Sequence, residues 1–187
     1  DPGVGKSSIV AHLVNTNPGG EVVAHHCCVS DEIETLRPAR FVQSIAAMLA
    51  NQLPDYARQL AIPAVAEALA DKRCGDDPAS AFSEGILRPL HAIAAPQEGI
   101  RYILIDALDE ALSYEGRNIV DLLRGRIERM PTWLRVLAPP RNDSSVLQRL
   151  NEFRTEPLDA APPENRQHLL SSVTAPSASR ELARTAR

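Results

Sequence analysis

The first eight residues place the strongest constraint on how this 187-residue chain can fold. They read D-P-G-V-G-K-S-S, and Gly5, Lys6 and Ser7 supply the last three fixed positions of the phosphate-binding pattern G-x-x-x-x-G-K-[ST]. Glycines let backbone N–H groups converge on phosphate oxygens, and a helix that begins there directs its positive end at the anion. The residues expected to bind nucleotide phosphates are Gly3, Val4, Gly5, Lys6, Ser7 and Ser8.

A second motif lies at residues 101–106, which read RYILID. A short apolar run that ends in a carboxylate is typical of a buried parallel strand. Mg²⁺ prefers oxygen ligands, so we expect Asp106 and the Ser7 hydroxyl to hold this ion beside the phosphates. Asp109 and Glu110 follow on the next turn, where either side chain could orient or activate an attacking water; we favour Glu110 as the base.

Between the motifs, apolar residues recur with helical or strand periodicity. Helices are expected at 7–16, 38–53, 61–72, 79–95, 117–130 and 163–173, and strands at 21–29, 101–106, 133–138 and 152–158. Pro89 should kink or break the helix that contains it. The alternation predicts an α/β fold with a parallel sheet and right-handed crossovers. Together with the two motifs it predicts the three-layer sandwich of a P-loop NTPase.

The pattern's first glycine would precede Asp1, so we expect the chain to be a piece of a longer protein. The first strand of a P-loop NTPase, which lies centrally and leads into the phosphate loop, would then be missing. Flanking strands would lose ladder partners and apolar cover, and the isolated chain should be poorly stable.

Residues 103–110, ILIDALDE, resemble the acidic motif of NACHT domains, within the STAND class of signal-transducing ATPases, and D-P-G-V-G-K-S-S resembles the matching phosphate loop. Other segments are similar to bacterial and animal NACHT proteins that carry ankyrin or WD-type repeats. They are 25–28 with Asp31, 35–38, 41–42, 77–78, 81–82, 131–134, 158–159 and 163–165. The resemblance implies a nucleotide-binding core over 1–160, and over 161–187 the start of a helical lid or a disordered tail.

The resemblance also implies Mg²⁺-ATP as ligand, ADP as product, slow hydrolysis that acts as a timer, and self-association in the ATP state. Protein partners would bind through repeat and effector domains outside this chain. Arg141 occupies the position of the arginine that senses the γ-phosphate, which adds it to the expected catalytic residues. The hydroxyl residue usual before that arginine is absent, and Pro139 and Pro140 remove two N–H donors.

These features predict a regulatory ATPase module that changes assembly state with nucleotide. The proline pair leaves open a second function, a non-hydrolysing scaffold that holds nucleotide for assembly. A third, a motor or small-molecule kinase, is less favoured because no second arginine-bearing motor motif is visible. No Asn-Lys-x-Asp run is present, so ATP is favoured over GTP.

Composition narrows the partners and the compartment. The formal net charge is −4 without a dense Lys/Arg run, so no nucleic-acid surface is expected. No apolar stretch approaches the ~18 residues of a membrane span. Three cysteines, two of them adjacent, make a poor disulfide framework and favour the cytoplasm. Residues 25–28 (His-His-Cys-Cys) carry metal-ligand atoms, but they alternate between strand faces and lack a second cluster, so we interpret them as part of a buried strand.

Overall fold

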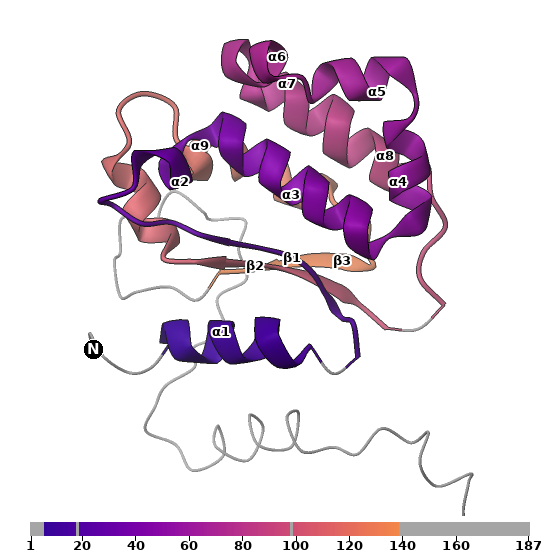
Figure 1. Ribbon diagram of the computed structural model, residues 1–187, viewed down its shortest axis with the longest axis horizontal. Coiled ribbons are helices and arrows are strands. Elements are labelled where there is room, and N and C mark those ends of the chain that lie inside the picture. The colour runs from indigo at the N-terminus through magenta and orange to yellow at the C-terminus, as the bar shows by residue number, and fades with distance from the viewer. Residues whose placement is uncertain (1–5, 18, 98, 139–187) are drawn as a thin grey trace, which may run out of the picture. The chain divides into compact units, whose positions relative to one another are not determined.

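The computed structural model describes residues 6–17, 19–97 and 99–138. In this part of the chain three parallel strands form one sheet in the order β1 (Val22–Cys27), β2 (Arg101–Asp106), β3 (Leu134–Leu137) (Figure 1). Each lies where the sequence pattern predicts a strand. The mixed α/β class and the parallel pairing are therefore confirmed for the described residues.

Strand β2 is paired along both of its edges. Its partners run from Val22↔Tyr102 to Cys27↔Asp106 on one side and from Arg101↔Leu134 to Leu104↔Leu137 on the other. This differs from the expectation that strands beside a missing central strand lose ladder partners. An open edge on so apolar a strand would leave buried N–H and C=O groups unsatisfied, and the direct pairing of β2 with β3 removes that cost.

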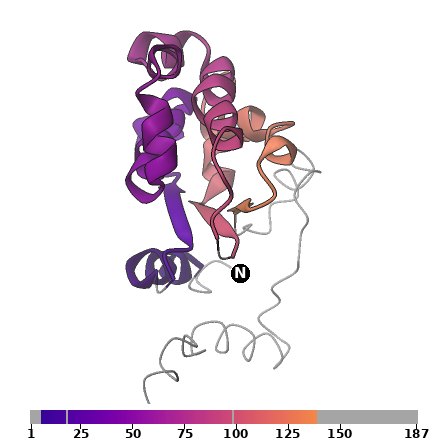
Figure 2. The same ribbon diagram turned by 90° about the vertical axis from the view of Figure 1, so that its right-hand side faces the viewer.

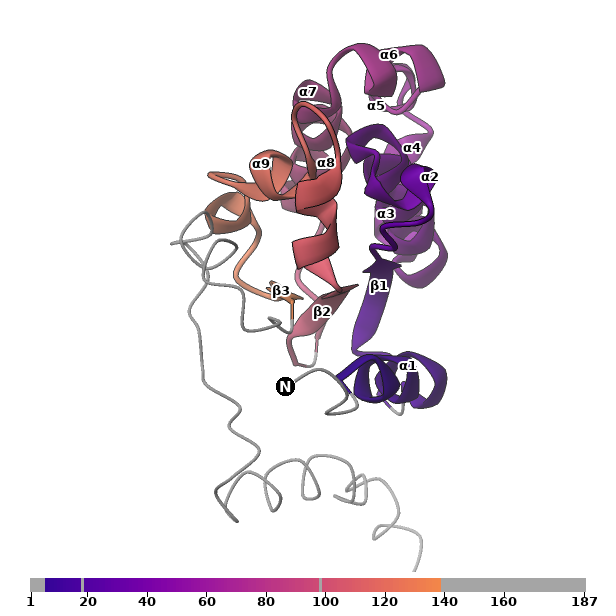
Figure 3. The same ribbon diagram turned by 90° about the vertical axis from the view of Figure 1, so that its left-hand side faces the viewer.

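Helices cover both faces of the sheet. Helix α1 (Lys6–Thr16) lies on one side, and Figures 1, 2 and 3 agree that the other labelled helices lie on the opposite side. The first two helices on the opposite side, in chain order, are α2 (Ile33–Leu36) and α3 (Pro38–Gln52). We call the two sides the α1 face and the α3 face. Predicted helices 7–16 and 38–53 are confirmed to within about a residue.

The helix predicted at 61–72 is wrong as a single element. The structure has three short helices in this region: α4 (Pro54–Leu60), α5 (Pro63–Ala68) and α6 (Asp71–Asp76). Proline suits the first turn of a helix because the N–H that it lacks would be unsatisfied there, so Pro54 and Pro63 each start a new helix. Periodicity across 61–72 could not reveal the break between α5 and α6.

The helix predicted at 79–95 is present but ends earlier, at His91, and a π-helical turn lies just before the segment that contains Pro89. Helix α7 (Pro78–Phe82) leads into η1 (Ser83–Leu87) and then α8 (Arg88–His91). Pro89 has no N–H to offer the carbonyl four residues earlier, that of Gly85. This carbonyl instead accepts a 2.7 Å hydrogen bond from the buried Tyr56 hydroxyl. The missing helical bond is thus replaced by a tertiary one.

The helix predicted at 117–130 is shorter than expected. Helix α9 (Ile119–Leu123) begins at a capping box formed by Asn118 and Asp121. Gly125, at φ 68°, then turns the chain, and the 3₁₀ turn η3 (Ile127–Arg129) follows. Glycine at positive φ ends a helix at little cost, which the apolar spacing alone did not reveal.

The core lies between the sheet and the helices that cover its α3 face. It includes Phe41, Ile45 and Leu49 of α3 packed against Ile103 and Ile105 of β2. In the part of the chain that the structure describes, no helix is both long and apolar enough to cross a membrane. The strand predicted at 152–158 and the helix predicted at 163–173 lie outside the described residues.

Candidate functional site

Asp106 lies at the carboxyl end of β2, where the strand leaves the core. Side chains alternate along a strand, and Ile103 and Ile105 pack into the core on the α3 face. Leu104 and Asp106 therefore point to the α1 face. Asp106 is paired in register with Cys27 of β1, and only 6% of its surface is exposed. A carboxylate so enclosed costs free energy unless it accepts hydrogen bonds or meets a cation.

The backbone turns sharply directly after Asp106. Ala107 has φ 52° and ψ 40°, in the left-handed region, and is 4% exposed. A residue with a Cβ costs about 1–2 kcal/mol there. In this conformation the Ala107 N–H donates a 3.0 Å hydrogen bond to Oδ1 of Asp106. The turn thereby fixes the carboxylate at the end of the strand, and it explains why a small residue follows the aspartate.

The turn leads into η2 (Leu108–Ser113), a 3₁₀ helix that carries Asp109 and Glu110, both half-buried. Oε2 of Glu110 accepts a 2.7 Å hydrogen bond from the backbone N–H of Ser30, which follows β1. The Cys28 N–H donates to the carbonyl of Asp106 over 3.1 Å. The segments that leave β1 and β2 are therefore joined to each other beyond the ends of the strands.

The pKa of the Cys28 thiol reflects the acidic side chains at this end of the sheet. Burial is the main cause that raises the pKa of its thiol to about 12. Negative charge on Cys27, Glu110, Asp109 and Asp106 adds to the increase, in that order. Cys28 stays a protonated thiol at neutral pH. The three carboxylates that the sequence pattern singles out lie close enough together to act on the same buried group.

Helix α1 begins at this end of the sheet. In Figure 1 its first turn and the carboxyl ends of β1 and β2 lie on the same side of the picture, at the left. The backbone of Lys6, Ser7 and Ser8 forms that first turn. The structure does not describe the side chains of these three residues. Of the other predicted site residues, Gly3, Val4, Gly5 and Arg141 lie outside the described residues.

The alternation predicted for the His-His-Cys-Cys run is confirmed. His26 and Cys28 are buried, whereas His25 and Cys27 are exposed. His26 packs edge-on to the Phe41 ring at 5.0 Å, and its Nε2 lies 2.7 Å from the carbonyl oxygen of Thr35. Because a carbonyl only accepts, Nε2 carries a proton. Within 6–138, leaving aside 18 and 98, no group of three or more His, Cys, Asp or Glu side chains could hold a metal ion.

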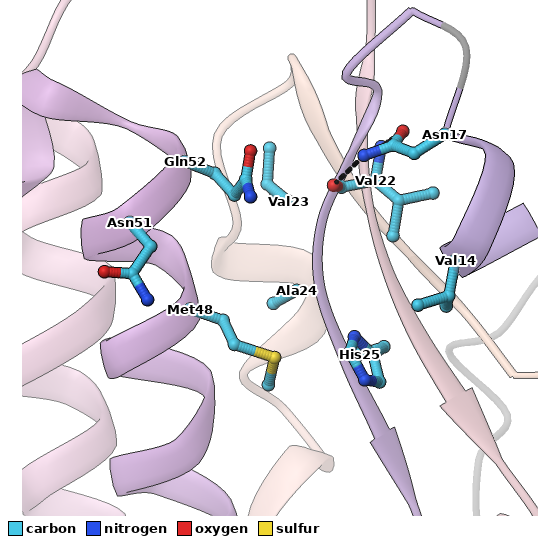
Figure 4. Close-up of a pocket in the computed structure, with 9 residues that line it drawn as sticks. All are labelled: Val14, Asn17, Val22, Val23, Ala24, His25, Met48, Asn51 and Gln52. Carbon is cyan, nitrogen blue, oxygen red and sulfur yellow. Dashed lines mark hydrogen bonds between the residues drawn. The ribbon is translucent and has the colours of Figure 1, made fainter.

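A cavity of about 240 Å³ lies elsewhere, along the edge of β1 that does not face β2 (Figure 4). Residues of α1, the first half of β1 and the end of α3 line it, among them Asn51 and Gln52. At its rim the Asn17 carboxamide bonds both backbone groups of Val22, at 3.0 and 2.9 Å. This cavity lies toward the amino end of the strand and does not include the acidic residues.

Residues 1–141 match the family model described as Nephrocystin 3, N-terminal. The chain belongs to the nephrocystin 3 N-terminal family. The matched family is not described as a NACHT domain, so the narrower resemblance stays a proposal. No solved structure matches the chain.

Two contributors to the site were not predicted from sequence. The Ser30 amide that binds Glu110 could belong to any residue except proline, so nothing in the sequence indicates it. Ala107 did carry a signal, since a small residue between Asp106 and Leu108 suits a sharp turn. Its left-handed backbone became evident only in the structure.

Proposed function

We propose that this chain of the nephrocystin 3 N-terminal family is the nucleotide-binding part of a regulatory P-loop ATPase of the NACHT kind. One observation carries the proposal. Asp106, at the end of a buried strand, points to the face covered by α1, and the backbone of Lys6 and Ser7 forms the first turn of α1, at the same end of the sheet. A helix amino end and a carboxylate at the same end of a parallel sheet suit Mg²⁺-ATP.

Each residue has a distinct task in this proposal. The amides of the loop at Gly3, Val4 and Gly5 and the Lys6 ammonium bind phosphate oxygens. Ser7 and Asp106 supply the oxygen ligands that suit Mg²⁺, which neutralises phosphate charge when bound. The hydrogen bond from Ala107 orients the Asp106 carboxylate toward the α1 face. Glu110 takes a proton from the attacking water, with Asp109 as the alternative base, and Arg141 senses the γ-phosphate.

In this proposal the chain acts as a switch because it hydrolyses ATP slowly. ATP shifts the population toward an assembly-competent state only if it binds that state more tightly than the other. Hydrolysis to ADP then ends the signal. The same proposal includes self-association of the module and places the protein in the cytoplasm.

Direct nucleotide binding tests the proposal. Lys6→Ala should weaken ATP binding about tenfold to hundredfold, the usual worth of a charged hydrogen bond. Asp106→Asn should abolish the tightening of ATP binding by Mg²⁺. Matched controls are Lys72→Ala and Asp76→Asn, two exposed positions on α6. Titration of a fluorescent ATP analogue with and without Mg²⁺ gives two affinities for wild type and for each of the four variants.

Two outcomes have clear meanings. If the folded wild-type chain does not bind ATP, or if Lys6→Ala binds as tightly as Lys72→Ala, the proposal fails. If ATP binds tightly but no phosphate is released in a single turnover, the non-hydrolysing scaffold suggested by the proline pair replaces the ATPase.

A further inference from the structure

The segment between β1 and α2 is a tight turn that presents one backbone amide to the acidic site. The Glu32 N–H bonds to the Val29 carbonyl over 2.9 Å, which closes a turn with Ser30 at its second position. The Ser30 N–H donates to Oε2 of Glu110 over 2.7 Å. Hydrogen bonds to a charged acceptor are strong and directional, so the place of this amide fixes one oxygen of the carboxylate.

The hydroxyl of Thr35 holds the two ends of that turn. Its Oγ1 accepts a 2.9 Å hydrogen bond from the Val29 N–H and lies 2.7 Å from the Glu32 carbonyl, to which it donates. The Val29 carbonyl is also near, at 3.2 Å. A single side chain thus satisfies a donor at the start of the turn and an acceptor at its end. Valine has the same shape and would keep the 2.9 Å bond from the backbone N–H of residue 35 to the Glu32 carbonyl, but its side chain could make neither of the hydroxyl bonds.

Thr35 is itself anchored to the core. Its carbonyl accepts the hydrogen bond from Nε2 of His26, at 2.7 Å, and the next residue, Leu36, is 1% exposed. His26 is packed against Phe41 of α3. A continuous set of hydrogen bonds therefore leads from the core through Thr35 and the turn to Glu110.

We propose that Thr35 is a positioning residue for hydrolysis: it sets the Ser30 amide, which orients the Glu110 carboxylate toward water. This inference rests on the proposed function. In the step concerned, the water oxygen bonds to the γ-phosphorus of ATP and the bond to the β,γ-bridging oxygen breaks. ADP and phosphate leave, and the proton released by the water passes to Glu110. The turn at 29–32 thereby couples the core to the rate of this step.

The first test separates positioning from folding. Thr35→Val should lower kcat about tenfold while leaving the affinity for ATP within about twofold, because misplacing a base affects the transition state and spares ground-state binding. Thr35→Ser keeps the hydroxyl and should restore most of kcat. Thr132→Val is the matched control, since Thr132 is exposed and distant in sequence. Urea unfolding of each variant measures the structural effect separately.

A second pair of variants addresses the amide directly. Proline is favoured at the second position of a turn and has no N–H, so Ser30→Pro removes the donor without opposing the turn. Ser30→Ala keeps the donor. We expect kcat to fall about tenfold in Ser30→Pro and to stay close to wild type in Ser30→Ala. In a Glu110→Gln background, Thr35→Val should cause little further loss of kcat, because coupled residues are not additive.

The outcomes distinguish this inference from the function beneath it. Should the wild-type chain bind and hydrolyse ATP while Thr35→Val and Ser30→Pro turn over at the wild-type rate, Thr35 is only a structural residue and the inference is overturned. Equal losses in Thr35→Val and Thr35→Ser would also overturn it. Absence of ATP binding in the folded wild type removes the proposed function itself, and binding without hydrolysis removes the step that Thr35 would serve.

Discussion

The two faces of the sheet differ in what they bury. On the α3 face, Ile103 and Ile105 pack against Phe41 and the rest of α3 with almost no exposure. On the α1 face, the alternate positions of β2 hold Leu104 and the carboxylate of Asp106, and the neighbouring strand exposes His25 and Cys27. Apolar burial contributes about 25 cal/mol per Å². The difference suggests that the α3 face supplies most of the stability and leaves the α1 face available for polar groups.

The largest expected effect tests this division of roles. Phe41→Ala should lower the free energy of unfolding by about 4 kcal/mol, because a buried ring is replaced by a cavity. His25→Ala, on the exposed face, should change it by less than about 0.5 kcal/mol. Urea denaturation of the two variants measures the contrast. Similar losses in both would contradict the idea that the faces have different roles.

An intermediate effect on the free energy of unfolding is expected at Ala107, which joins β2 to η2. Ala107→Val should lower the free energy of unfolding by about 2 kcal/mol, because a β-branched residue is strongly disfavoured at positive φ. Ala107→Gly should be nearly neutral. Relief of about 1 kcal/mol of backbone strain offsets the loss of a buried methyl group worth about 0.8 kcal/mol. Thermal or urea unfolding measures both, and a glycine variant more than about 1 kcal/mol less stable would argue against the left-handed backbone.

The smallest expected effect is a pH dependence of the free energy of unfolding. It is caused by His26, which packs against Phe41 on the α3 face. Burial is the main cause that lowers the pKa of His26 below its ordinary value of 6.5, against a smaller opposing effect of its hydrogen bond to Thr35. Between the folded and unfolded pKa values the unfolded chain binds the proton and the folded chain does not. The stabilisation that neutral His26 contributes to the folded state is therefore fully present above pH 6.5. It is lost as the pH falls from 6.5 through the lower pKa of the folded chain.

His26→Gln checks this dependence, because a glutamine amide can still donate to the Thr35 carbonyl but does not titrate. The variant should lose less stability than wild type when the pH is lowered below 6.5, as measured by urea unfolding at several pH values. The same substitution at the exposed His25 serves as control. An unchanged pH profile in His26→Gln would mean that another group causes the loss.

Much of the described fold was predictable because it depends on local patterns. The apolar run at 101–106 indicated β2 and put Asp106 at its end, and the helical period of residues 38–53 indicated α3. Breaks within helices were missed where one residue decided them. Pro63 starts a helix inside a predicted one, and Gly125 ends α9 early. Periodicity averages over several residues, so a single break is hidden in it.

The site was only partly predictable. The grouping of Asp106, Asp109 and Glu110 followed from the end of one strand and the turn after it, which the sequence contains directly. Their connection to Ser30 involves segments 80 positions apart and a backbone donor that carries no sequence signature. The predicted residues from Gly3 to Gly5, and Arg141, lie outside the described residues, so their part in the site stays a prediction.

The sequence by itself determined the α/β class, the strand that ends in Asp106 and the alternation of residues 25–28, because each depends on the spacing of side chains along a short segment. Tertiary structure alone decided that β2 pairs directly with β3, that Ala107 adopts a left-handed backbone, and that the Ser30 amide meets Glu110. These features depend on backbone groups that nearly every residue carries, and their partners are chosen only when distant segments pack together.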